Sequence, residues 1–365
     1  MNLDHFDGMH TYSSSTPASF ISRFGNAPGS NVGTGSVIGL GTGAFGLPSL
    51  CTDDLTALLP VPGSPSKYTM GGRFYYISST VSRGCGFSFV DAAGNVIAQC
   101  ALLDTGEVIA TSNGAKYYAN ALSLSGTSLG SKSVTVNNKV YYEFEVELTV
   151  GTGTSGALVA ALNGNIVLNL QNIDTQGTAG SSIGYAGVIG ASYKSGAQNF
   201  YEDVYWLNSV GTATGASFLT ATCGPMGPRS RLLMPTSDGS IMQFTPSTGT
   251  SGYACVNGVT FNDTPYIEAG AAGDVAQFGL GTFSASNILG VQTRFVGHAD
   301  DAGTVNINGQ LIVAGAVTNG ATISYTASDA DQTDLYLTDP TTGAAWQPSR
   351  FSTQGVMQVG LNRTA

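Results

Sequence analysis

The stretch YYEFEVELTV, residues 141–150, decides the fold class of this chain. Its even-numbered positions, from Tyr142 to Val150, are aromatic or aliphatic, and Glu143, Glu145 and Glu147 occupy odd-numbered ones. Alternation with a period of two is typical of a strand that turns one face to a core, and we expect the glutamate face to point into water. The stretch therefore predicts an antiparallel sheet with one buried face.

Strand signals continue on both sides of this stretch. Two apolar runs, 157–162 and 165–170, are joined by Asn163-Gly164, a pair that tolerates the positive φ angles of a tight hairpin. Further strand patterns occupy residues 182–192, 200–207, 287–297, 304–314 and 321–326. The best helical candidate is residues 53–59, and it is stopped by prolines. Strands joined by short turns without intervening helices indicate an all-β sandwich or jelly roll.

Local composition divides the chain into three parts. Residues 13–66 are rich in Gly, Ser, Thr and Pro, and a small, polar segment at 208–216 marks a boundary after the strands. We expect an N-terminal arm over 1–66, partly packed on the sandwich. The sandwich itself is expected over 67–215, and a smaller β-rich domain over 216–365.

Composition also excludes several classes of protein. Charged residues make up 10% of the chain and the net charge is −10, so the clustered basic footprint of a nucleic-acid binder is missing. No apolar run is long enough for a transmembrane helix, and residues 1–7 lack the pattern of a signal peptide. We therefore expect synthesis in a cytoplasm without secretion. The five widely spaced cysteines form no CxxC pair and are expected to be small core residues.

The three glutamates Glu143, Glu145 and Glu147 are the candidate catalytic residues of the chain. Alternate residues of a strand lie about 6.5–7 Å apart, and retaining glycosidases use two carboxyl groups about 5–5.5 Å apart. The pattern resembles the Glu-x-Asp-x-Glu strand of some concanavalin-like glucanases, with Glu145 in place of the central Asp. The alternative is a solvated strand face whose charges keep the sheet soluble. We expect that alternative, and hence no catalytic residue.

The stretches that could suggest a metal or cofactor site also have structural interpretations. Residues 4–10 hold two Asp and two His, which could bind a metal or form a polar N-terminal edge. The acidic pairs at 300–301 and 329–331 are expected in turns rather than at a calcium ion. The GxGxxG match at 41–46 has no helix signal after it and is expected to be a surface loop. We expect no metal and no cofactor, and the sequence leaves any binding residues unknown.

A set of short motifs resembles, in order and along nearly the whole chain, a group of tailed-bacteriophage virion proteins with a concanavalin A-like β-sandwich domain. The matching stretches are residues 6–12, 141–146, 162–165, 174–175, 200–205, 232–239, 243–247, 300–304 and 339–346. No single stretch is specific, but the ordered set is.

This resemblance implies a fold, a role and partners. The fold would be a concanavalin A-like antiparallel jelly roll with an extended N-terminal arm and a smaller C-terminal β domain. Independently of the resemblance, the large indole ring of Trp346 is expected to anchor the C-terminal segment to the core. The role would be that of a non-enzymatic virion component, such as a tail fibre, a tail appendage or a head decoration. Its partners would be other virion proteins and further copies of itself, a trimer among the expected forms, and it could contact a host-surface glycan. The alternative is a virion-associated polysaccharide-degrading enzyme that uses the Glu143, Glu145 and Glu147 strand.

Overall fold

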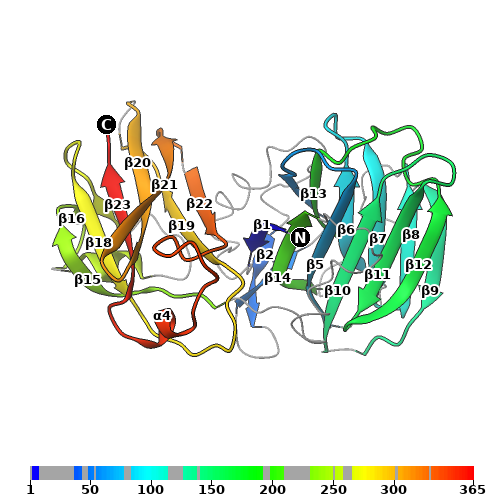
Figure 1. The fold of residues 1–365 in the computed structure, drawn as a ribbon, viewed down its shortest axis with the longest axis horizontal. Helices are drawn as coiled ribbons and strands as arrows, with labels where there is room; N and C mark the ends of the chain where they lie inside the picture. The colour runs from blue at the N-terminus through cyan, green and yellow to red at the C-terminus, as the bar shows by residue number, and fades with distance from the viewer. Residues whose placement is uncertain are drawn as a thin grey trace. The chain divides into compact units, whose positions relative to one another are not determined.

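A computed structural model shows a chain of antiparallel strands in two compact units, Met1–Ser230 and Arg231–Ala365. The structure describes residues 2–7, 37–42, 48–52, 55–77, 84–113, 126–137, 140–191, 198–208, 231–249, 251–257, 265–300, 303–328 and 330–365. Both units are all-β, as the alternation in the sequence predicts (Figure 1). The division lies after residue 230, beyond the segment 208–216 that the sequence marks as a boundary.

The first unit is a sandwich of two antiparallel sheets. The order along the larger sheet is β12 (Asn165–Ile173), β11 (Gly156–Leu162), β10 (Tyr141–Thr149), β5 (Lys67–Ile77), β14 (Gln198–Asn208), β3 (Pro48–Thr52) and β2 (Val37–Thr42), and β1 (Asn2–Asp7) also pairs with β14. The order along the smaller sheet is β4 (Leu55–Pro60), β13 (Tyr185–Ala191), β6 (Gly84–Val90), β7 (Val96–Leu103), β8 (Glu107–Ser112) and β9 (Thr127–Ser133). The segment before residue 67, expected as an arm, thus supplies four strands to the two sheets.

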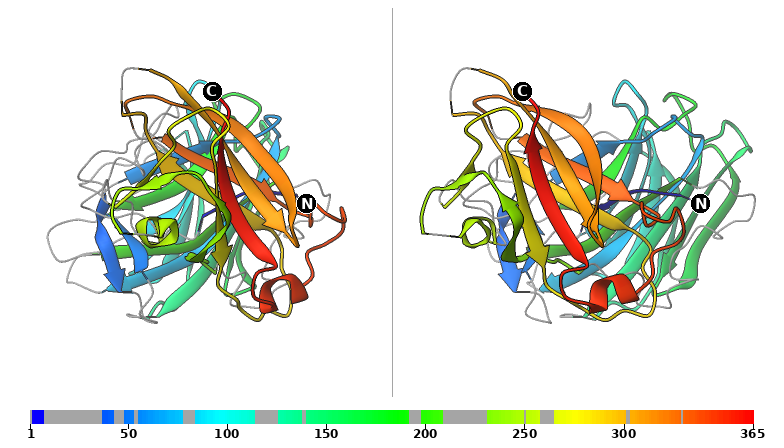
Figure 2. Two further views of the ribbon diagram at one scale, coloured as in Figure 1. Left: turned by 90° about the vertical axis from the view of Figure 1, so that its left-hand side faces the viewer. Right: turned by 60° about the vertical axis from the view of Figure 1, so that its left-hand side comes forward.

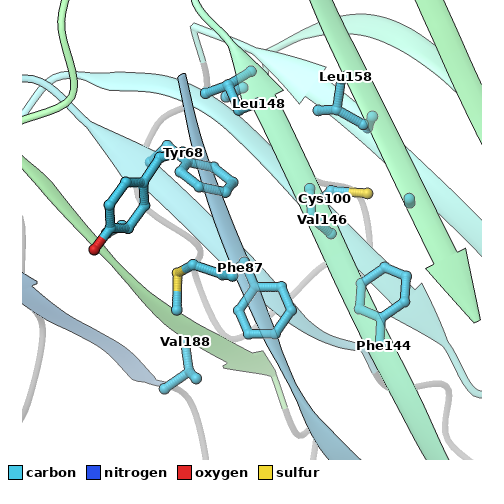
Figure 3. Packing of buried hydrophobic residues seen from close by; sticks show 14 of the residues in the cluster. Tyr68, Phe87, Cys100, Phe144, Val146, Leu148, Leu158 and Val188 are labelled. Atoms are coloured by element: carbon cyan, nitrogen blue, oxygen red, sulfur yellow. The ribbon is translucent and has the colours of Figure 1, made fainter. Parts of the chain in front are cut away.

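The core lies between the inner faces of these sheets. Phe144 of β10 and Phe87 of β6 stack at a centroid distance of 5.9 Å and an interplanar angle of 9° (Figure 3). Two side chains of β14 also bond across the core to the backbone of β13: Tyr201 Oη donates to Ile189 O at 2.9 Å and Trp206 Nε1 donates to Ala186 O at 2.8 Å. These bonds hold the two sheets in one register while apolar burial supplies the cohesion.

Two local expectations have opposite outcomes. The Asn163-Gly164 turn is confirmed, since both residues have positive φ (50° and 78°) and join β11 to β12. The helix considered for residues 53–59 is wrong, because Leu55–Pro60 forms β4 and pairs with β13. Leu58 packs in a different cluster from Ala57, so the strand is buried on both faces. A short apolar run of this kind has no period that separates strand from helix.

The second unit is built on a five-stranded sheet (Figure 2). Its order is β15 (Pro235–Met242), β18 (Val275–Leu280), β23 (Met357–Arg363), β20 (Val305–Val313) and β21 (Ala316–Tyr325). Two strand pairs, β16 (Thr245–Pro246) with β17 (Ile267–Glu268) and β19 (Val291–Gly297) with β22 (Ala330–Tyr336), and the short helices α3 (Gly252–Val256) and α4 (Ser349–Ser352) complete it.

One core cluster of this unit is centred on aromatic residues. Trp346 is 2% exposed, packs on Phe351 and donates from Nε1 to Tyr336 O at 2.8 Å, which confirms its expected anchoring role.

The helices of the described residues are all too short or too polar to cross a membrane.

Candidate functional site

The glutamates of β10 do not face water. Glu143, Glu145 and Glu147 are 3%, 0% and 3% exposed, so the expectation of a solvated strand face is wrong. The alternation itself is correct, because the even-numbered residues Phe144 and Val146 of the same strand lie in the sandwich core. The alternation of residue types predicts which side chains share a face of the strand. Whether other parts of the chain bury that face depends on the tertiary structure.

Strand register places the partners of these glutamates. Glu143 lies opposite Arg73 of β5 and Glu145 lies opposite Gly71, which in turn lies opposite Tyr205 of β14. We call the resulting group the carboxylate layer. It consists of Glu143, Glu145, Glu147, Arg73, Asp203 and Tyr205, all 0–3% exposed.

Tyr205 reaches across a neighbouring strand to a glutamate. Its hydroxyl donates to Oε1 of Glu145 at 2.5 Å, although β5 separates the two strands. Gly71 of β5 makes room, because a Cβ at that position would lie 2.1 Å from both Cζ and Oη of Tyr205. A glycine between the two strands is thus a condition for the bond.

Arg73 and Asp203 form a buried ion pair beside this bond. Nη1 of Arg73 lies 3.0 Å from Oδ2 of Asp203, and the guanidinium stands over the Tyr141 ring at 4.3 Å from its centroid. Asp203 has a φ of 52° and lies in a bulge of β14 between Glu202 and Tyr205. A bulge re-aims a side chain, and this one brings the Asp203 carboxylate to Arg73. At the other end of β10, Lys67 Nζ lies 3.3 Å from Oε1 of Glu147.

The surroundings of one carboxyl group of the layer, that of Glu143, favour its neutral form. Burial raises the pKa of Glu143 well above its usual value, and the charges of Glu145 and Asp203 raise it further. Arg73 and the Tyr205 hydroxyl lower it without reversing the rise. Burial likewise raises the pKa of the Tyr205 hydroxyl, which therefore stays a donor. An acid with a raised pKa beside a second carboxyl group is a pair that can transfer protons, and here the side chains of both are buried, at 0–3% exposure.

The N-terminal Asp and His residues serve the fold. Tyr68 Oη donates to Oδ2 of Asp4 at 2.9 Å, and burial raises the pKa of Asp4 more than this bond and His5 lower it. His5 Nε2 lies 3.0 Å from Pro60 O, and the ring meets Trp206 edge-on. These contacts tie β1 to the sandwich. The side chain of Asp7 and all of His10 lie outside the described residues.

The other acidic candidates are also dispersed. Asp300 lies 3.5 Å from His298, and Asp331 pairs with Arg294 across β19 and β22, while Asp301 and Asp329 lie outside the described residues. No three His, Cys, Asp or Glu side chains within the described ranges come together in a geometry that could hold a metal ion. Most of the GxGxxG stretch likewise falls outside them.

Sequence reasoning missed Arg73, Asp203 and Tyr205. A signal existed for Arg73, because Lys67, Thr69 and Arg73 alternate with core residues of β5 and so mark a second polar strand face. Asp203 shows no such signal, because the bulge breaks the alternation of β14 at that point.

Comparison with known proteins gives information on the fold of this chain and not on its activity. No protein family and no curated protein matches the chain. Among solved structures, the alginate lyase Aly36B is 16% identical, with a TM-score of 0.36, over 57% of this chain and 96% of its own. The PL-14 alginate lyase of Aplysia kurodai is 12% identical, with a TM-score of 0.41, over 57% and 100%. Sheep galectin-11 is 13% identical, with a TM-score of 0.27, over 41% and 96%. Likenesses this distant carry no information on activity.

Proposed function

We propose that this chain is a non-enzymatic structural component of a bacteriophage particle, a tail fibre, tail appendage or head decoration. It acts by protein–protein contact within the virion and by contact with a host-surface glycan. The ordered resemblance of its motifs to tailed-phage virion proteins supports this role.

The observation that carries the proposal is the burial of the carboxylate layer. Glu143, Glu145 and Glu147 are the groups in which catalysis is most expected, and they are 0–3% exposed. Two of them have partners within the sheet, Tyr205 for Glu145 and Lys67 for Glu147, whereas the two carboxyl oxygens of Glu143 are buried without a hydrogen-bond partner. A buried polar group that is bonded to its neighbours, as Glu145 and Glu147 are, makes the fold more specific, and its burial separates it from a dissolved substrate.

Mass spectrometry of purified phage particles, with copy-number counting, tests this function. Hundreds of copies per particle would identify a capsid decoration, and a few to a few dozen would identify a fibre or tail appendage. Absence of the chain from the particle would overturn the proposal.

A polysaccharide-degrading enzyme is the second candidate function. The specific observation in its favour is Glu143, a carboxyl group with a raised pKa next to Glu145 on the same strand. A carboxyl group with a raised pKa beside a second carboxyl group is a pattern of acid–base catalysis. Chain shortening of host capsule or lipopolysaccharide that disappears in Glu143→Gln, but persists in a control Glu268→Gln on the exposed Glu268, would favour this candidate. The structural role predicts that the unaltered chain, the Glu143→Gln variant and the Glu268→Gln variant all leave the polysaccharide at full length.

A further inference from the structure

Strand β1 is bonded to both sheets of the sandwich. It lies off the main path of the larger sheet and pairs with β14 from Asn2 to Asp7 (dark blue in Figure 1). Its His5 ring reaches the smaller sheet, where Nε2 lies 3.0 Å from the carbonyl oxygen of Pro60 at the end of the edge strand β4. The contacts of this one strand therefore hold the two sheets together along the side where β14 and β4 meet it.

A bulge in β1 turns an acidic side chain inward. Leu3 and His5 lie opposite consecutive residues of β14, so Asp4 between them is the extra residue of the bulge. The Asp4 carboxylate reaches Tyr68 of β5, a residue of the sandwich core, whose hydroxyl donates to Oδ2 at 2.9 Å. Docking of β1 on the sandwich therefore carries a carboxyl group from the sheet edge to a half-buried position against the core.

The surroundings of Asp4 offer little to a charged carboxylate. Among the residues that the structure describes, the Tyr68 hydroxyl is its one hydrogen-bond donor. Asp91 of the same sandwich instead accepts four N–H bonds at 2.8–2.9 Å, from Ala93, Asn95 and Gly180. Burial raises the pKa of both side chains, and the hydrogen bonds reverse this rise for Asp91 but not for Asp4. Asp4 is thus protonated more easily when β1 is docked than when it is in water.

The other groups around Asp4 do not remove this preference. Burial raises the pKa of the Tyr68 hydroxyl, which therefore stays a neutral donor. The charge of protonated His5, on β1 itself, lowers the pKa of Asp4 by less than burial raises it. The residues opposite on β14, Leu207 and Trp206, and Pro60 of β4 carry no charge.

We propose that β1 is an acid-strengthened latch, a strand that holds the two sheets together most tightly at acidic pH and leaves them more readily as the pH rises. Asp4 takes up a proton from solvent when β1 docks and returns it when β1 leaves. The contribution of this proton to docking is complete below the ordinary pKa of 3.8 and is lost as the pH rises through the raised pKa of docked Asp4. Over that interval the ratio of released to docked β1 rises by at most about tenfold per pH unit. The inference concerns the sandwich alone and does not rest on the proposed virion role.

Trp206 reports whether β1 is docked. Its ring is buried and meets the His5 ring edge-on at a centroid distance of 6.0 Å, so release of β1 uncovers it. In the full chain with Trp346→Phe, Trp206 is the remaining tryptophan, and the uncharged quencher acrylamide measures its exposure from about pH 4 to about pH 7. We expect the quenching constant to rise several-fold with pH in this chain. It should stay low and level when Asp4→Asn is added, because an amide still accepts from Tyr68 and does not titrate.

Two further variants separate the latch from other effects of pH. Glu143→Gln is the matched control, since it removes another carboxyl group with a raised pKa from the same sandwich, on β10, and it should keep the rise. Tyr68→Phe removes the one donor to the ionised carboxylate and should enlarge the rise. Circular dichroism at each pH should show an unchanged strand signal. A level quenching constant in the unaltered background, an equal rise with Asp4→Asn, or a rise that disappears with Glu143→Gln or accompanies loss of the strand signal would overturn the proposal.

Discussion

Two buried tyrosines of one strand allow the carboxylate layer to be tested by a matched substitution. Tyr201 and Tyr205 both lie on β14 and both are 0% exposed. The Tyr205 hydroxyl donates to the Glu145 carboxylate, whereas the Tyr201 hydroxyl donates to the neutral Ile189 carbonyl at 2.9 Å. Tyr205→Phe and Tyr201→Phe therefore remove one hydroxyl each and differ in the charge of the acceptor left behind.

The difference in cost follows from the acceptor. A hydrogen bond to a charged group contributes about 1.5–3 kcal/mol, and one between neutral groups about 0.5–1.5 kcal/mol. We expect Tyr205→Phe to lower the free energy of unfolding by about 1 kcal/mol more than Tyr201→Phe does. In a domain of the size of the first unit, this is an additional loss of about 2–4 °C in Tm.

Tryptophan fluorescence can follow the sandwich alone. The chain has two tryptophans, Trp206 in the sandwich core and Trp346 in the second unit, so a Trp346→Phe background leaves Trp206 as the reporter. Urea unfolding of the single variants and of Tyr205→Phe combined with Glu145→Gln completes a double-mutant cycle. Equal costs for the two tyrosine variants, or a coupling between Tyr205 and Glu145 below about 0.5 kcal/mol, would refute the reasoning.

Three further predictions concern the same layer. Because the pKa of Glu143 is raised above its usual 4.5 in the folded chain, the unaltered protein should lose stability as pH rises above 4.5, by at most about 1.36 kcal/mol per pH unit until the raised pKa is passed. The Glu143→Gln variant should equal the unaltered protein in free energy of unfolding near pH 4 and exceed it at pH 7. A stability difference that does not change with pH in urea unfolding would contradict this prediction. Gly71→Ala, whose Cβ would overlap Tyr205, should cost about 1–3 kcal/mol, and Gly72→Ala, with 3.2 Å to its nearest neighbour, should cost less in the same assay. Asp203→Ala should cost about 3–5 kcal/mol because it removes one member of a buried ion pair, and a loss below 1 kcal/mol in thermal unfolding would show that the pair is solvated.

Much of the fold follows from short-range patterns in the sequence. The alternation of residues 141–150 predicts β10 and its core-facing side chains, and the Asn163-Gly164 pair predicts the hairpin between β11 and β12. These features are readable because they depend on the two-residue repeat of a strand and on the φ angles that a turn demands. The strand β4 could not be predicted from the sequence, because a strand that is buried on both faces shows no alternation of apolar and polar residues.

The candidate site likewise has features that local sequence patterns predict and features that depend on the tertiary structure. The sequence alone determined that Glu143, Glu145 and Glu147 share one face of a strand, because successive side chains of a strand point to opposite sides. The burial of this face, the reach of Tyr205 past Gly71 to Glu145 and the bulge that turns Asp203 towards Arg73 arise from the packing of distant strands. These contacts join residues 60 and 130 positions apart, and their existence depends on sheet order and register, which no local pattern in the chain encodes.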